Sequence, residues 1–286
     1  MRSVKFLVAA GAASLLSSTA FAADMAIAPP PQYYAPPVED FGGWYLRGDI
    51  GFSNQRVKNI AMADGRNAQL LSLQETTAFD TAGVFDLGVG YQFNNWLRGD
   101  ITGQFRGNSN FKGADVTTFP AGNGVIGNGI DNYSASKSEW LILANGYVDL
   151  GTWWSITPFV GAGVGMSRVT ISNYTDNGIV NQSGFPPVAG TYPSGATAAQ
   201  ASKWNFAWAL HTGLAYRVNP SLTLELAYGY VDLGDGTTGP VTDYTGFTRG
   251  VPMQFENITS QDLMFGMRWN LDNPTVYAPP PLVTKG

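Results

Sequence analysis

The stretch from Val84 to Arg106 alternates apolar residues with polar or small ones on both sides of Asn94-Asn95. Successive side chains of a β-strand point to opposite faces, so a period of two gives a strand two faces of different character. Two alternating segments joined by a two-residue Asn turn are typical of a β-hairpin. The stretch therefore predicts a hairpin with one aliphatic and aromatic face and one face of charges and glycines.

The same alternation recurs along the chain, and each segment is about as long as a tilted strand needs to be to cross a bilayer. The segments are 44–53, 84–93, 97–106, 139–150, 156–171, 203–218, 222–233 and 261–271. We expect every strand to repeat the two faces, with no apolar core left for the strands to enclose. The apolar face then contacts lipid. The predicted fold class is all-β, an eight-stranded antiparallel transmembrane β-barrel.

The connections between these segments alternate strictly in length. Short connections are expected at 94–95, 151–155 and 219–221, and long ones at about 54–79, 107–137, 172–202 and 234–259. This alternation is typical of outer-membrane barrels, which have short periplasmic turns and long extracellular loops.

The two ends of the chain differ in composition from the middle. Residues 1–22 hold two basic residues, a short apolar run and the sequence Ala20-Phe21-Ala22, which together predict a cleaved signal peptide. Residues 23–42 and 272–286 are rich in proline and are expected to form extended periplasmic tails around a barrel at 43–271. These tails are either solvated spacers or docking segments for a periplasmic partner.

Composition limits the chemistry that this chain can perform. It has no cysteine, which excludes disulfides, a thiol nucleophile and a thiolate metal site. Its net charge of −5, without a basic patch, argues against a nucleic-acid partner. Only 13% of its residues are charged and 13% are aromatic, which suits a wall that contacts lipid. We predict no catalytic residue, cofactor or metal site.

The polar faces of the strands carry nearly balanced charges. An eight-stranded barrel is just wide enough inside for side chains to fill it, so these charges are expected to pair across a plugged lumen. The predicted ion-pair network consists of Arg47, Asp49, Asp86, Arg98, Asp100, Arg106, Glu139, Asp149, Arg217, Glu225, Asp262 and Arg268.

Three motifs resemble functional signatures, but their positions argue against those functions. Arg47-Gly48-Asp49 and Arg98-Gly99-Asp100 are RGD tripeptides within predicted strands, where Arg and Asp face inward. Residues 122–127 match G-x-G-x-x-G but lack the strand and helix that a dinucleotide site needs, so we expect a flexible loop. His211, the only histidine, is expected to make a hydrogen bond in the lumen.

Three stretches carry a resemblance to a known family: 43–48 (GWYLRG), 157–165 (TPFVGAGVG) and 266–269 (GMRW). On these, the chain resembles the small eight-stranded outer-membrane barrels of Gram-negative bacteria, in the opacity/surface-antigen branch of the OmpA-like superfamily. The resemblance implies a multi-pass protein of the outer membrane, in contact with lipid and lipopolysaccharide. It also implies an insertion signal at Gly266, Trp269 and Leu271, read by the barrel insertion machinery. Fifteen residues follow this signal, and leucine stands where the family has a terminal aromatic residue.

We therefore predict a non-enzymatic structural protein or surface antigen that makes contacts through its loops. Loops on a rigid scaffold are the usual place for binding, and their aromatic residues are candidate anchors. The alternatives are a small-solute porin, a transport barrel that binds haem or another ligand and, less favoured, a lipid A-modifying enzyme that uses His211. The candidate anchors are Phe111, Phe119, Phe185, Tyr192 and Phe247.

Overall fold

The computed structural model describes residues 42–122, 124–182 and 190–272. The predicted signal peptide and nearly all of both proline-rich tails lie outside these residues, and so does Phe185. One short 3-10 helix, η1, spans Arg66–Gln69. Within the described part of the chain, no helix is long and apolar enough to span a membrane.

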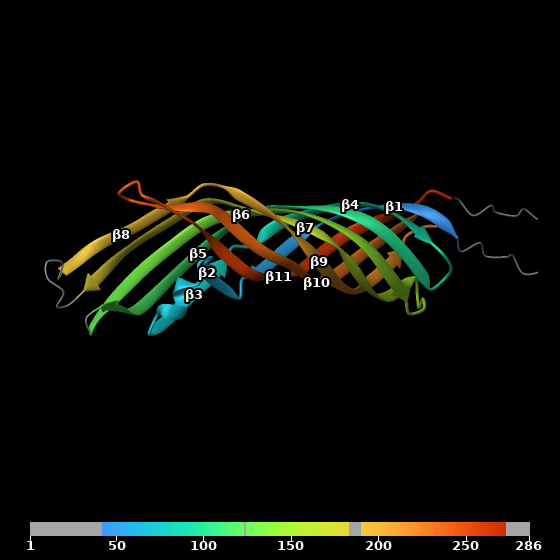
Figure 1. The fold of residues 1–286 in the computed structure, drawn as a ribbon. Coiled ribbons are helices and arrows are strands. Elements are labelled where there is room, and N and C mark those ends of the chain that lie inside the picture. Colours follow the sequence, from blue (N-terminus) through green and yellow to red (C-terminus); the bar gives the residue numbers. More distant parts are fainter. Residues whose placement is uncertain (1–41, 123, 183–189, 273–286) are drawn as a thin grey trace, which may run out of the picture. The chain divides into compact units, whose positions relative to one another are not determined.

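Eight antiparallel strands close into a ring, which confirms the predicted fold class (Figure 1). Each strand pairs with the next along the chain, and the last strand pairs with the first, from Tyr45 opposite Asn270 to Arg56 opposite Thr259. The ring contains β1 (Gly43–Arg56), β4 (Ala82–Gln92), β5 (Leu97–Gly122), β6 (Val125–Asp149), β7 (Ile156–Gln182), β9 (Ala201–Arg217), β10 (Leu222–Asp243) and β11 (Thr248–Asn270).

The long connections differ from the predicted loops, because most of their residues continue the strands. β5 and β6 remain paired as far as Gly122 and Val125, so the predicted flexible loop at 122–127 lies at the end of a hairpin. Three short strands add to this extension: β2 (Asn59–Met62) pairs with β11, β3 (Ser72–Phe79) with β5, and β8 (Gly190–Ala198) with β7 and β10. Pairing satisfies backbone groups that a loop would leave to water.

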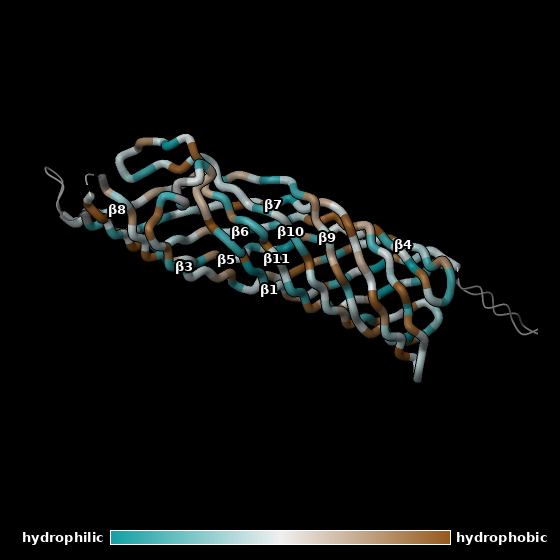
Figure 2. The backbone as a smooth tube through the Cα atoms, turned by 60° about the horizontal axis from the view of Figure 1, so that its bottom comes forward, coloured by the Kyte–Doolittle hydropathy of each residue, from teal (hydrophilic) through white to brown (hydrophobic). Residues whose placement is uncertain are grey.

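The outer face of the barrel changes character along its length. Near the short turns it is apolar, with large exposed side chains such as Leu87 (74%) and Phe206 (68%). Hydrophobic and hydrophilic residues alternate along these strands, as Figure 2 shows. Beyond Phe105 and Trp140 the outward positions become mainly polar, and they include Asn110, Lys112, Asn128, Asn132, Ser134 and Asn177. The apolar band therefore ends there, and we call the part of the barrel beyond it the distal half.

The barrel encloses an apolar core, contrary to the expectation that the strands enclose none. The core occupies the distal half and extends into the apolar band, where Leu141 lies opposite Gln104 and Leu143 opposite Thr102. Where the outer face meets water instead of lipid, burial of apolar side chains again favours the inside. Its members are Ile60, Phe111, Ala135, Leu141, Leu143, Val169, Ile171, Tyr174, Ala207, Ala209, Val231, Leu233, Val241, Met253, Phe255 and Ile258.

Among several register irregularities in the distal half, β-bulges in β5 and β7 reset the alternation of those two strands. In β5, Gly107 and Asn108 together lie opposite one residue of β6, since Arg106 pairs with Glu139 and Ser109 with Lys137. Such an extra residue changes which later positions face inward. Phe111 is consequently 1% exposed, so the prediction that it is an exposed loop aromatic is wrong.

The second bulge lies in β7, where the pairing shifts between Ser134 and Ser136 of β6. Asn173 has a φ of 53°, a left-handed conformation that asparagine tolerates better than most residues. Unbroken alternation from Ile171 would place Asn173 inside. Instead Asn173 is exposed and Tyr174 is buried.

Candidate functional site

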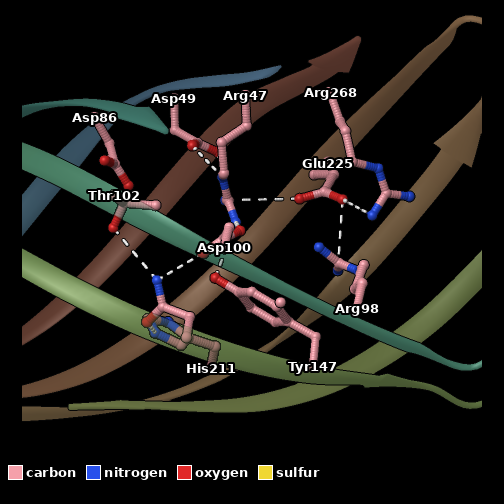
Figure 3. A network of polar contacts seen from close by, with 12 residues as sticks. Arg47, Asp49, Asp86, Arg98, Asp100, Thr102, Tyr147, His211, Glu225 and Arg268 are labelled. Carbon is pink, nitrogen blue, oxygen red and sulfur yellow. Dashed lines mark hydrogen bonds and ion pairs between the residues drawn. The ribbon is translucent and has the colours of Figure 1, made fainter. Parts of the chain in front are cut away.

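A cluster of charged side chains fills the barrel inside the apolar band (Figure 3). Arg47 of β1 donates to both carboxylate oxygens of Asp49, from Nε to Oδ2 and from Nη2 to Oδ1, each at 2.9 Å. Its Nη1 lies 2.9 Å from Asp100 Oδ2 on β5 and 2.9 Å from the hydroxyl oxygen of Tyr147 on β6. Both RGD tripeptides thus direct Arg and Asp into the barrel, where all four side chains are buried.

Glu225 of β10 lies among three guanidinium groups. Its carboxylate oxygens are 3.3 Å from Arg268 Nη1, 3.5 Å from Arg98 Nη2 and 3.7 Å from Arg47 Nη2. Arg98 also pairs with Asp149 at 3.2 Å. One anion lies among three cations, and two of these, Arg47 and Arg98, also pair with other carboxylates, which makes this a network and not a set of separate pairs.

Two aromatic rings, nearly perpendicular to each other, contact the same Arg98 side chain. Its guanidinium carbon lies 4.2 Å from the ring centre of Tyr147 and 4.7 Å from that of Phe159. A cation over an aromatic face is attracted by the ring's quadrupole, more strongly where water is excluded. Arg98 is fully buried, so these contacts and the carboxylates replace its hydration.

A second charged cluster lies nearer the distal half. Arg106 pairs with Asp262 at 2.6 Å and also donates to the hydroxyls of Ser53 and Ser260. Lys137 contacts Glu139 and Gln55. Lys137 is 1% exposed, but it was not predicted as a lumen residue, because it lay in a predicted loop. Its spacing of two from Glu139 was the signal that could have found it.

The remaining predicted site residues lie in different environments. Asp86 is buried and accepts a hydrogen bond from Gln104 Nε2 at 3.0 Å. Arg217 does not join the network: it is the last residue of β9, at the short-turn rim, and its side chain is exposed. The placement of Arg217 in the lumen network is therefore wrong.

The residues of the predicted insertion signal lie on both faces of the last strand. Gly266 faces inward, where a Cβ atom would lie only 1.8 Å from Asp49 Oδ1, so this position requires glycine. Trp269 and Leu271 face outward and are about half exposed. Their recognition by insertion machinery stays a prediction.

His211 makes a hydrogen bond inside the barrel, from Nε2 to Asn145 Oδ1 at 3.2 Å. Asn145 in turn donates to Asp100 at 2.8 Å and to Thr102 at 3.3 Å. A cavity of about 30 Å³ lies beside these residues. That volume suits about one water molecule and cannot hold a lipid or a haem.

A much larger cavity, of about 580 Å³, lies inside the distal half. Its walls come from β2, β3, β5, β6, β7, β8, β10 and β11 and from η1. The predicted anchor Phe119 lines this cavity and is only half-buried. Among the described residues, no group of three or more His, Asp or Glu side chains is arranged to hold a metal ion.

Exposed apolar side chains gather at the tips of the distal hairpins. Tyr244 is 67% and Phe247 66% exposed, both at the turn between β10 and β11. Leu71 and Ile126 are exposed at neighbouring tips, and Tyr192 of β8 is partly exposed. Of the predicted aromatic anchors, Phe247 and Tyr192 are thus on the outer surface of the distal half.

Comparison with known proteins covers most of the chain. A family model described as "Outer membrane protein beta-barrel domain" matches residues 8–255. A Brucella abortus protein without an assigned function is 30% identical over 77% of this chain and 78% of its own length. A candidate adhesin of Rickettsia felis is 29% identical over 89% of this chain and 95% of its own length. The solved structure of OprG from Pseudomonas aeruginosa aligns with 14% identity and a TM-score of 0.45, over 80% of this chain and 96% of that chain.

Proposed function

This chain belongs to the outer membrane β-barrel family, and from that premise we propose that it is a non-enzymatic surface protein whose distal hairpins make contacts outside the cell. The barrel itself serves as a rigid scaffold in the outer membrane. The similarity to a candidate adhesin of Rickettsia felis supports this proposal.

The observation that carries the proposal is the exposed Tyr244 and Phe247 at the β10–β11 turn. Both lie beyond the apolar band, in a region where outward side chains are otherwise mainly polar, so lipid does not explain their exposure. Exposed aromatic residues rimmed by polar ones mark interaction surfaces, and aromatic residues dominate binding energy at such surfaces.

The contents of the barrel interior favour a structural scaffold as the function, and disfavour transport. Two clusters of buried charged side chains lie in the lumen, together with an apolar core that extends from the apolar band into the distal half. We infer that small solutes do not pass, because a conducting path needs continuous water. His211 is hydrogen-bonded to an amide and lies beside a cavity of about 30 Å³, which disfavours catalysis on lipid.

Adhesion of cells that display the protein tests the proposal. We expect the double variant Tyr244→Ser/Phe247→Ser to lose most of its adhesion to cultured mammalian cells, because the anchors of the contact are removed. The matched control is Trp153→Ser/Trp154→Ser, which removes two exposed aromatic residues at the opposite, short-turn end. This control should adhere as the unaltered protein does.

Each variant is first checked for folding by the heat-dependent shift of the barrel on gels. Unchanged adhesion by a folded Tyr244→Ser/Phe247→Ser variant would remove the support for the proposal. Equal losses in both double variants would indicate a general effect of exposed aromatic residues and would count against a contact through the distal hairpins.

A further inference from the structure

The cavity of about 580 Å³ in the distal half has both apolar and polar walls, and the charged residues in those walls are mainly acidic. Its volume falls within the roughly 300–1,000 Å³ of small-molecule sites. Among the residues that the structure describes, the charged side chains that line it are five carboxylates and one guanidinium: Glu75, Asp115, Asp131, Asp176, Asp243 and Arg249. We call this feature the acidic cavity.

Three of these carboxylates form a row across neighbouring strands. Glu75 of β3 lies directly opposite Asp115 of β5, and Asp115 lies directly opposite Asp131 of β6. Like charges at directly opposite positions of paired strands repel each other. A row of three is therefore an unfavourable arrangement that a positive charge in the cavity would relieve.

Neighbouring residues hold two of the carboxylates in place. Asp131 accepts a hydrogen bond from Ser194 Oγ of β8 at 2.8 Å. It lies across from Gly178 of β7, where a Cβ atom would come within 1.9 Å of Asp131 Oδ1. Asp115 accepts a hydrogen bond from the Tyr133 hydroxyl. The carboxylates are thus positioned by specific contacts and are not merely near one another.

Several buried polar atoms of the cavity lack hydrogen-bond partners. These are the hydroxyl oxygen of Tyr174, Oδ1 of Asp115 and Oδ1 of Asp176. Tyr174 is 2% and Asp115 7% exposed. A buried polar atom without a partner is costly, so such atoms in a cavity indicate groups that a ligand would satisfy.

We propose that the acidic cavity binds a small organic cation through a primary ammonium or guanidinium group. The carboxylates supply opposite charge, and the unpartnered oxygens accept hydrogen bonds from the N–H groups of the ligand. The rings of Tyr133 and Tyr174 are stacked, with centres 6.3 Å apart, and offer an aromatic surface to the cation. An organic cation suits these spread carboxylates better than a metal ion, which needs convergent ligands.

The charge of the cavity depends on pH. Burial, followed by repulsion from Asp131 and Asp115, raises the pKa of Asp176 to about 7, although Arg249 opposes this. Burial also raises the pKa of Asp131, of Asp115 and of Glu75, the last two with a contribution from a neighbouring carboxylate. A cation prefers the ionised carboxylates, so binding should be strongest above pH 7 and weaken as pH falls and Asp176 takes up a proton.

Calorimetric titration of the refolded full chain with agmatine, which carries one ammonium and one guanidinium group, tests the proposal. We expect saturable binding at pH 8 that weakens by about tenfold at pH 6, because a carboxyl group with a pKa of about 7 is about nine-tenths ionised at pH 8 and about one-tenth ionised at pH 6. The double variant Asp131→Asn/Asp176→Asn should bind at least about tenfold more weakly, because two charge-assisted hydrogen bonds are lost. The variant Tyr174→Phe removes a single hydroxyl and should weaken binding by a smaller factor.

The control variant is Asp80→Asn, since Asp80 is an exposed carboxylate of the distal half outside the acidic cavity. It should bind agmatine as the unaltered chain does. N-acetylarginine amide presents the same guanidinium group as a protein side chain. If N-acetylarginine amide binds as tightly as agmatine, an arginine side chain of a protein can supply the cation. If agmatine binds clearly more tightly, the ligand is a free amine.

Absence of saturable agmatine binding would overturn the proposal, as would equal affinity of the Asp131→Asn/Asp176→Asn variant. Binding of calcium chloride in place of agmatine would show a metal site and overturn it as well. These measurements use purified protein and no cell surface. A chain that adheres normally but does not bind agmatine would therefore contradict this inference alone, not the proposed function.

Discussion

Arg98 illustrates how single residues hold the interior of this barrel together. It is fully buried, it contacts Asp149 and Glu225, and its guanidinium packs against two aromatic rings. A buried charge is tolerated only while partners replace its hydration. Removal of Arg98 would leave both carboxylates facing fewer cations in a confined space.

We expect Arg98→Ala to lower the free energy of unfolding by about 3–5 kcal/mol, the usual cost of removing one partner of a buried ion pair. Lys112→Ala is the matched control, because Lys112 is a cation on the outer face of the same strand. Urea unfolding of both variants in lipid vesicles measures the difference. Equal, small effects would mean that water solvates the interior, and the transport alternative would gain support.

Alternation along the sequence predicts the charged clusters well at the residue scale, because each strand inside the apolar band keeps a strict period of two. The period placed Arg47, Asp100 and Glu225 on the inner face before any contact was known. It could not predict which cation contacts which carboxylate, since that depends on the register between strands. Arg217 shows the other limit, because an inward position at a strand end can still be open to solvent.

At the scale of elements, the β5 bulge determines what faces inward in the distal half. Gly107 and Asn108 share one position opposite β6, so Ser109 and Phe111 lie inside. A bulge leaves little mark on the sequence, and residues 107–137 are rich in Gly, Asn and Ser, which favoured a loop. The acidic cavity was missed for the same reason, since both bulges precede residues that line it.

A pair of single deletions tests this account of the bulge. Deletion of Asn108 should be tolerated, because Gly107 alone can then oppose β6 and every later side chain keeps its face. Deletion of Ser138, on β6 across from the bulge, should turn Lys137 outward and reverse the faces of the β6 residues that precede it, from Val125 to Ser136. Limited proteolysis of the refolded variants distinguishes them: cleavage within 107–137 is expected only without Ser138. Equal resistance of the two variants would contradict the account.

At the scale of the whole molecule, the change in the outer face accounts for the change in the inner one. Inside the apolar band, lipid surrounds aliphatic and aromatic side chains and the interior is charged. In the distal half, the outer face is mainly polar and the interior contains most of the apolar core, which begins inside the band at Leu141 and Leu143. Sequence analysis predicted the first arrangement and not the second, because it assigned the distal residues to loops and expected no enclosed core.

The paired charges and the apolar core inside the barrel together lead to a prediction for conductance. Ions crossing the barrel would have to pass charged side chains that are paired with one another, as well as buried apolar residues such as Leu141, Leu143 and Phe255, each 0% exposed. Neither region leaves room for a continuous column of water, and the cavity beside His211 holds about one molecule. We therefore expect the refolded protein to show no stable unitary channels in planar bilayers, under conditions in which a refolded general porin does.

The double variant Leu141→Ala/Leu143→Ala should show no channels either, because the charged clusters still block the path. Stable, sizeable channels from the unaltered chain would contradict the closed interior, and conductance in the double variant alone would locate the seal in the apolar core.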